Sequence, residues 1–218
     1  MSDEQAPPMA AGNTPVVTQL LLINGVAFLA TLAAPEMMFS AFALWPLADP
    51  AAMNVTAAMP RGSFAPWQVV SYAFMHGGFL HLAINMFVLW MFGKPLESRW
   101  GSRPFAVFYL FCIAGTGLVQ LLIASSGVAP PAPTVGASGG VFAVLLGFGL
   151  MYPNQMVLLI FPPIPMKAKY FVIFIGVIEL MAGVSGTTPG VANFAHLAGM
   201  VFGLVFILLY RNRLERGG

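Results

Sequence analysis

Charged side chains are scarce in this chain, and the scarcity predicts where the protein resides. Asp, Glu, Lys and Arg make up only 7% of its 218 residues, whereas hydrophobic residues make up 59%. A soluble domain usually carries about 25% charged residues. The segment from Pro104 to Met166 contains none of the four. A soluble fold cannot leave so much surface uncharged, so the sequence predicts an integral membrane protein with one helical domain.

Other absences narrow the classes of function. The single cysteine, Cys112, cannot form an internal disulfide, and we expect it to be a small core residue. The net charge of +2 is too small to indicate nucleic-acid binding. No His is followed by Glu, so the HExxH motif of zinc proteases is absent, and we expect no metal and no cofactor. The first residues carry no basic region, so we expect the first apolar segment to stay as a membrane helix.

Six apolar segments approach the roughly 20 residues that a spanning helix needs. They are about Val16 to Ala34, Phe79 to Phe92 (extended at either end), Pro104 to Ala124, Ser138 to Tyr152, Ala168 to Val184 and Ala192 to Tyr210. The sequence therefore predicts an all-α polytopic bundle over residues 16–210, with a flexible tail at 1–15 and a basic tail at 211–218. The long first connection, Pro35 to Met75, is rich in Pro, Trp and Met, and we expect short, partly inserted helices in it.

The basic residues predict how the bundle is oriented. If the N-terminus is cytoplasmic, the cytoplasmic side receives all of the nine Lys and Arg residues except Arg61. These cations are Lys94, Arg99, Arg103, Lys167, Lys169, Arg211, Arg213 and Arg216. Both tails are then cytoplasmic and the first connection is outside. The chain shows no internal repeat, which disfavours a transporter built from inverted repeats.

A few polar residues fall near the outer ends of three predicted helices. Ser138 opens the fourth helix, and His196 lies about one turn into the sixth. His81 and Asn85 lie near the start of the second, four residues apart on one face. Because the fourth helix is short, we expect Ser138 to lie below the outer surface, in a water-containing hollow.

Two stripes of small residues predict that the fourth and sixth helices pack closely. The stripes are Gly139, Ala143 and Gly147 on the fourth helix, and Ala195, Gly199 and Gly203 on the sixth. His196 lies about one turn before Gly199. Close packing is therefore expected to bring its ring beside Ser138.

These residue types fit nucleophilic catalysis. A serine hydroxyl becomes a strong nucleophile when a base accepts its proton, and His196 is the candidate base for Ser138. The oxyanion that follows needs donors, which the backbone N–H of Ser138, the His81 ring and the Asn85 amide can supply. Gly136, together with Gly139, would let the backbone turn tightly around the hydroxyl.

No Asp lies in a predicted span, and Glu179 is the only acidic residue that does. An aspartyl protease, which needs two acids at depth, is therefore disfavoured. We predict a Ser–His dyad rather than a triad, and a structural role for Glu179, although it could also line the edge where a substrate enters. Taken alone, Ser138 fits a packing residue between helices better than a nucleophile, and only the other polar residues favour the catalytic role.

Three motifs in order resemble the rhomboid intramembrane serine proteases. They are HGGFLHLAIN from His76 to Asn85, GASGG from Gly136 to Gly140, and AHLAG from Ala195 to Gly199, and the resemblance covers about residues 66–210. It implies a six-helix protease that cleaves transmembrane segments of other proteins in a lipid bilayer. We expect a bacterial inner membrane, with the active site opening to the outer side.

The resemblance assigns Ser138 as the nucleophile, His196 as the general base, and His81 and Asn85 as the oxyanion-stabilising pair. It gives His76 a supporting role.

Two positions depart from the family pattern. Gln68 follows Trp67 where an Arg is common, so an Arg-based loop anchor is absent. Phe142 stands where many members have Tyr beneath the histidine ring, so stacking survives and a hydroxyl is lost. The alternative function is a catalytically silent relative that binds or escorts membrane helices.

Overall fold

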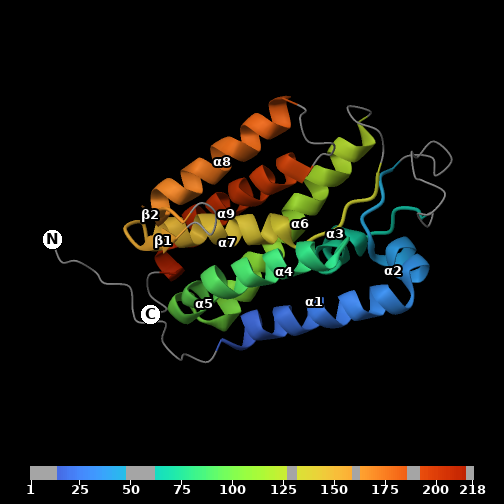
Figure 1. Cartoon of the computed structure of the whole chain (residues 1–218), viewed down its shortest axis with the longest axis horizontal. Coiled ribbons are helices and arrows are strands. Elements are labelled where there is room, and N and C mark those ends of the chain that lie inside the picture. Colours follow the sequence, from blue (N-terminus) through green and yellow to red (C-terminus); the bar gives the residue numbers. More distant parts are fainter. Residues whose placement is uncertain (1–13, 48–61, 127–131, 159–162, 186–191, 215–218) are drawn as a thin grey trace.

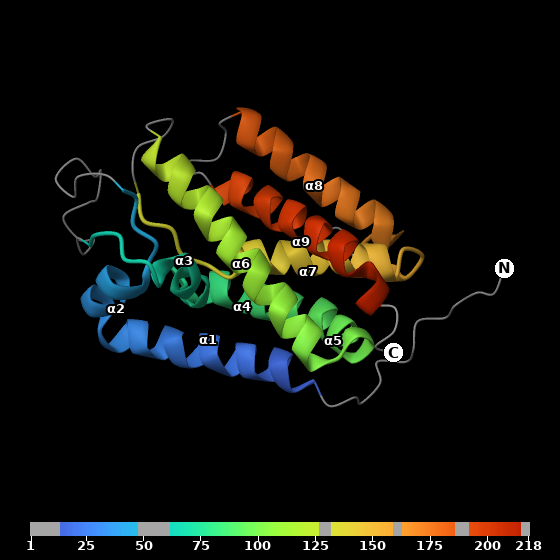
Figure 2. The ribbon, with the colours of Figure 1, turned by 180° about the vertical axis from the view of Figure 1, so that it is seen from behind.

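The computed structural model describes residues 14–47, 62–126, 132–158, 163–185 and 192–214. Within these ranges, five helices are long and apolar enough to cross a membrane. They are α1 (Pro15–Ala33), the run from α4 to α5 (Phe79–Trp100), α6 (Ser102–Ser125), α8 (Ala168–Ser185) and α9 (Ala192–Leu214). A sixth, α7 (Ser138–Met151), is shorter and lies among the others (Figures 1 and 2). The predicted all-α membrane bundle is confirmed.

Two spans run beyond the residues that bound their apolar segments. The second was expected to extend at either end, and it extends at its C-terminal end: α4 (Phe79–Val88) continues through a π-helical turn, η3 (Leu89–Gly93), into α5 (Lys94–Trp100). Helix α9 continues beyond Tyr210 to Leu214, into the segment predicted as a tail. The predicted N-terminal tail lies almost wholly outside the described residues.

Helix α7 packs closely against α6 and α9 because small residues line both contacts. A Cβ on Gly139 would lie 2.5 Å from Cγ2 of Thr116 on α6. A Cβ on Gly203 of α9 would lie 3.2 Å from Cα of Ala143, and one on Gly199 would overlap the carbonyl oxygen of Gly139. The backbones of α7 and α9 therefore touch at Gly199, as the two stripes predict.

Glu97 is a second acidic residue within a spanning segment, and the prediction that Glu179 is the only one is wrong. The carboxylate of Glu97 is only 1% exposed. It accepts hydrogen bonds from the backbone N–H groups of Val16 (2.9 Å) and Val17 (2.8 Å) and from the Ser102 hydroxyl (2.6 Å). The first N–H groups of a helix have no partner within it and attract negative charge. Glu97 thus caps α1 and joins it to α5 and to the start of α6.

The first connection contains short helices, as predicted: α2 (Pro35–Phe42), α3 (Gln68–Ser71) and a 3₁₀ turn, η2 (Tyr72–Phe74). Residues 48–61 lie outside the described part of the chain. Leu44 and Thr134 form an isolated antiparallel bridge, with N–O distances of 3.0 and 2.9 Å. This bridge joins the first connection to the segment that leads into α7.

Gln68 anchors the first connection, although no Arg stands there. Its side chain is 1% exposed. Its Oε1 accepts hydrogen bonds from the backbone N–H groups of Trp45 and Ala65, both at 3.2 Å, and its Nε2 donates to the carbonyl of Ser63 at 3.1 Å. A side-chain amide can both donate and accept, so Gln68 alone binds backbone N–H groups and a backbone carbonyl. Gln68 therefore binds the first connection at the position where the sequence offers no Arg.

A short antiparallel hairpin between α7 and α8 was not predicted. Its strands are β1 (Met156–Leu158) and β2 (Pro165–Lys167), with Val157 opposite Met166. Figure 1 shows it at the end of the bundle where α5 lies, where α1 begins and where α9 ends.

Substituting Gly199 by Ala tests the contact between α7 and α9. The added methyl group would overlap a backbone carbonyl, so we expect a loss of about 1–3 kcal/mol and a lower thermal unfolding temperature in detergent. Gly25→Ala on α1 is the matched control, because a Cβ there meets no atom within 4 Å. Equal stability of the two variants would show that the helices do not pack as described.

Substituting Gln68 by Ala tests the anchor. Several buried backbone groups would lose their partner, so we expect a loss of about 1–3 kcal/mol and faster cleavage of the first connection in limited proteolysis. Gln155→Ala, at an exposed position, is the control and should behave as the unchanged protein. An unchanged cleavage rate in Gln68→Ala would contradict the role of Gln68.

Candidate active site

Ser138 is the first residue of α7, and the turn before it depends on Gly136. Gly136 has a φ of +130°, which only glycine adopts readily. Its N–H donates to the carbonyl of Tyr72 at 3.0 Å, which fixes the turn against η2. A Cβ on Gly136 would lie 2.8 Å from Cε1 of His81 and 3.8 Å from the Ser138 hydroxyl oxygen. The hydroxyl and the His81 ring therefore flank the same glycine.

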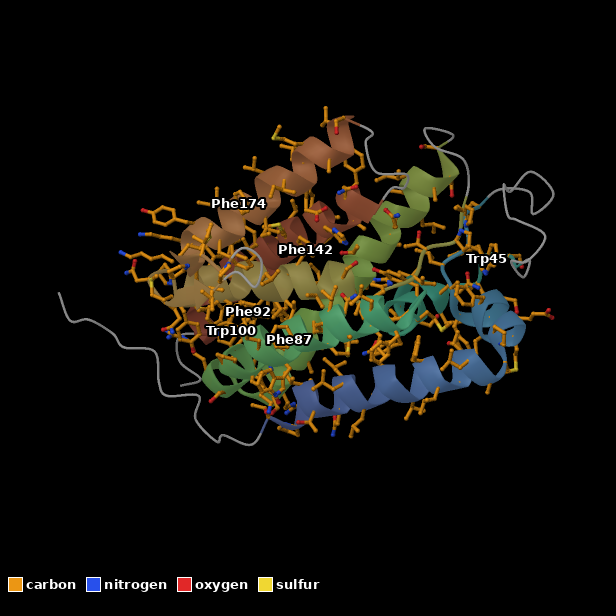
Figure 3. All side chains as sticks on the ribbon, in the orientation of Figure 1. Trp45, Phe87, Phe92, Trp100, Phe142 and Phe174 are labelled. Carbon is orange, nitrogen blue, oxygen red and sulfur yellow. The ribbon has the colours of Figure 1, made fainter. Side chains whose placement is uncertain are left out.

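His196 lies on α9 and stacks on Phe142 of α7. The ring centroids are 4.2 Å apart and the planes differ by 5°. Phe142 follows Ser138 by about one turn, and Figure 3 labels it in the middle of the bundle, where α7 and α9 run side by side. With the Gly199 contact, this stacking places His196 at the Ser138 end of α7. Within the described residues, no hydrogen bond joins the Ser138 hydroxyl to the His196 ring.

His81 and Asn85 lie on α4 and complete the group of predicted polar residues. The His81 ring is close enough to His196 to interact with it electrostatically. The Asn85 amide is buried and donates to the carbonyl of His81 at 2.8 Å. Polar side chains of α4, α7 and α9 thus meet in one region, as their similar predicted depth suggests.

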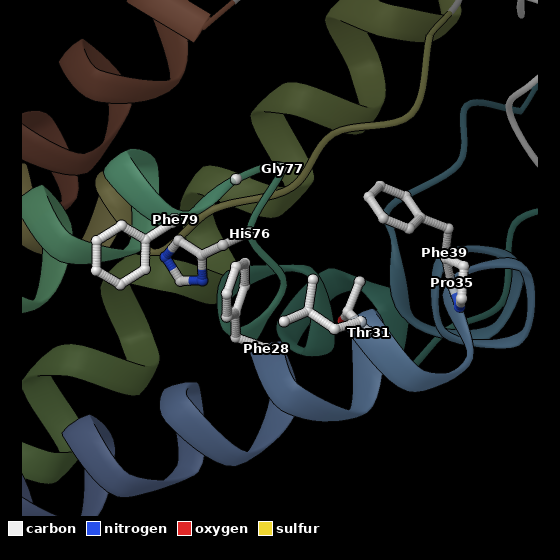
Figure 4. A pocket seen from close by; sticks show the side chains of 9 residues that line it. Phe28, Thr31, Pro35, Phe39, His76, Gly77 and Phe79 are labelled. Atoms are coloured by element: carbon white, nitrogen blue, oxygen red, sulfur yellow. The ribbon is translucent and has the colours of Figure 1, made fainter.

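His76 precedes α4, outside the spanning helices, and its ring contacts the ring of His81. The two rings meet edge to face, with centroids 5.0 Å apart. His76 also lines a cavity of about 530 Å³ between α1 and the start of α4, where it lies between Phe28 and Phe79 (Figure 4). Burial above all, and next the neighbouring His81, lower the pKa of His76 to about 4. Its ring is therefore neutral near pH 7, which fits a supporting role. Ser138 does not line this cavity. The water-containing hollow expected at Ser138 therefore stays a prediction.

Glu179 of α8 is the site neighbour that the sequence interpretation missed. Its Oε2 lies 2.9 Å from Nδ1 of His196 and accepts a hydrogen bond from the amide of Asn193 at 2.7 Å. The approach to Nδ1 is oblique to the ring N–H direction, so the contact is a close polar approach rather than a linear hydrogen bond. The interpretation gave His196 no acidic neighbour. The sequence did carry a signal for it, because Glu179 is the only acidic residue in its apolar segment.

Comparison with known proteins identifies the family. A model of the Rhomboid domain matches residues 63–213. The Rhomboid protease GlpG of Serratia proteamaculans is 31% identical over 150 residues, which cover 64% of this chain and 46% of that protein. Rhomboid protein 1, mitochondrial, of Saccharomyces cerevisiae is 31% identical over 140 residues, covering 63% and 40%. RHOMBOID-like protein 4 of Arabidopsis thaliana is 30% identical over 154 residues, covering 66% and 34%.

This chain therefore spans less than half the length of each of these three relatives. The region that matches the family model begins before α3 and continues almost to the end of α9, so it contains the helices that carry the Ser138 site. Because that region is more than half of the chain, the protein belongs to the rhomboid family.

Proposed function

We propose that this chain is an intramembrane serine endopeptidase that cleaves transmembrane segments of other membrane proteins. The observation that supports this best is the meeting of a helix-terminal serine with two histidines from two other helices. Ionisable side chains are rare within membrane spans because their burial is costly, and they are therefore usually functional. A protease among the relatives supports the same chemistry.

The proposed reaction begins at the Ser138 hydroxyl. Its oxygen attacks the carbonyl carbon of the scissile peptide bond, while Nε2 of His196 accepts its proton. The same imidazolium then donates that proton to the leaving amine, which gives an acyl-enzyme. Because no hydrogen bond joins Ser138 to His196 in the described structure, we expect the two to draw together when a substrate binds.

The oxyanion is proposed to lie between the start of α7 and α4. The backbone N–H of Ser138 is at a helix N-terminus, where the helix dipole favours negative charge. The His81 ring flanks Gly136 on the same side as the hydroxyl. The Asn85 amide uses one N–H on the carbonyl of His81 and has a second to offer. Three donors from two helices would then meet the developing charge.

Hydrolysis sets two requirements on the surroundings. Water must reach the acyl-enzyme. Ser138, the first residue of α7, is only half-buried, which leaves a path for it. The substrate helix must unwind near its outer end, because a peptide bond within a regular helix is shielded by its own turns. Small or helix-breaking residues at the cleavage site would ease this step. The substrate is thus a membrane protein with an unstable end to its spanning helix.

The orientation in the membrane is also part of the proposal. Lys94 and Arg99 of α5 and Arg103 of α6 gather at the end of the bundle where α1 begins. We place this end, with both chain termini, in the cytoplasm, and the Ser138 end toward the outside of a bacterial inner membrane.

Substituting Ser138 by Ala, or His196 by Ala, should reduce cleavage of a single-span substrate by about 10³-fold or more, because each removes a group that acts in bond breaking. The measurement is cleavage by the purified protein in detergent. A fluorophosphonate probe should label the unchanged protein and fail to label Ser138→Ala.

Gly25→Ala is the control for purification and folding and should cleave as the unchanged protein does. Thermal unfolding shows whether each variant is folded. Cleavage that persists in folded Ser138→Ala would refute the assignment. A folded parent protein that binds membrane helices but is neither labelled nor active would favour the escort function.

A further inference from the structure

We infer that Glu179 is a positioning residue that holds His196 for catalysis, so that the site is a Ser–His–Glu arrangement supplied by three helices. This inference rests on the proposed function. Ser138 comes from α7, His196 from α9 and Glu179 from α8. The three residues are far apart in the sequence, and only the packing of α8 against α9 brings the carboxylate to the ring.

The contacts around His196 leave one of its edges for the serine. One face of the ring stacks on Phe142 at 4.2 Å between centroids, and its Nδ1 faces Glu179 at 2.9 Å. Stacking alone fixes the plane of the ring but not its rotation within that plane, because Phe142 has no hydroxyl to bind it. The carboxylate supplies that second restraint. Nε2, on the opposite edge, is then the nitrogen available to Ser138.

Glu179 is itself held in place. Asn193, one turn before His196 on α9, is buried and donates to the same Oε2 that approaches the ring. A charge-assisted hydrogen bond of this kind is short and strong, and its length here is 2.7 Å. The carboxylate therefore has a fixed site on α9, although its own helix is loosely packed: among the residues of α8, only Ala168 and Val172 are fully buried.

A carboxylate beside Nδ1 has two effects on catalysis. It favours the neutral tautomer with its proton on Nδ1, which leaves a lone pair on Nε2 to accept the serine proton. It also stabilises the imidazolium that forms when that proton arrives. The proton moves from the Ser138 oxygen to Nε2 of His196 and then to the leaving amine, and Glu179 stays ionised throughout.

The competing explanation is that Glu179 only joins α8 to α9 through Asn193. A test must therefore include a measurement that helix packing alone would not change. The pH dependence of cleavage is such a measurement. The titratable groups that face His196 are Glu179 from α8 and His81 from α4, with His76 behind His81. Helix α7, which packs Phe142 against the ring, carries no charged residue.

The decisive variant is Glu179→Gln, which keeps the shape and an oxygen for Asn193 but removes the negative charge. We expect kcat to fall by about 10²-fold with KM changed by less than about threefold. The acid limb of the pH–rate profile should also move, because the charge beside Nδ1 is removed. Glu179→Asp should restore part of the rate and the original limb.

Glu36→Gln, at an exposed position on α2, is the matched control and should leave both kcat and the acid limb unchanged. Thermal unfolding of every variant separates folding from catalysis. An unchanged kcat in Glu179→Gln would overturn the inference. So would a fall that parallels a loss of thermal stability while the acid limb stays in place. If the parent protein shows no Ser138-dependent cleavage and no labelling, the proposed function fails, and this inference fails with it.

Discussion

The contact between the backbones of α7 and α9, at Gly139 and Gly199, is the constraint on which the site depends. Only glycine leaves room for a carbonyl group at this position of the facing helix. The contact fixes how far α9 can lie from the start of α7, and hence where His196 lies relative to Ser138. In lipid, such close packing also supplies much of the attraction between helices, since the lipid chains are as apolar as the side chains.

Buried polar side chains replace water in the rest of the bundle. Glu97 satisfies the first N–H groups of α1, and Gln68 serves backbone groups of the first connection. Without these partners, each backbone group would lose its hydrogen bond in a region that lacks water. Irregular backbone is therefore tolerated close to the site because specific side chains bind it, and the bridge between Leu44 and Thr134 extends this support to the segment before α7.

The region around His196 combines a closely packed part with a loosely packed one. Phe142 and the Gly199 contact belong to the central helices, whereas Glu179 comes from α8, whose outer side chains are mostly exposed. The polar contacts of Glu179 with His196 and Asn193 lie where these two parts meet. A displacement of α8 would change the surroundings of the histidine directly. The packing of a peripheral helix and the proposed chemistry of the central ones are thus physically linked.

The membrane class, the helical bundle and the helices on which the polar residues lie could all be predicted from the amino-acid sequence. Apolar length and the scarcity of charge decide these features locally, and the small-residue stripes even predicted which two helices touch. Three contacts appear only in the folded chain: Gln68 anchors the first connection, Glu97 caps a helix distant in sequence, and Glu179 lies against His196. These contacts join segments that are far apart along the chain, and no local pattern encodes the distance between them. Side-chain partners of this kind are fixed by packing, because the geometry of the whole bundle decides which polar atoms meet.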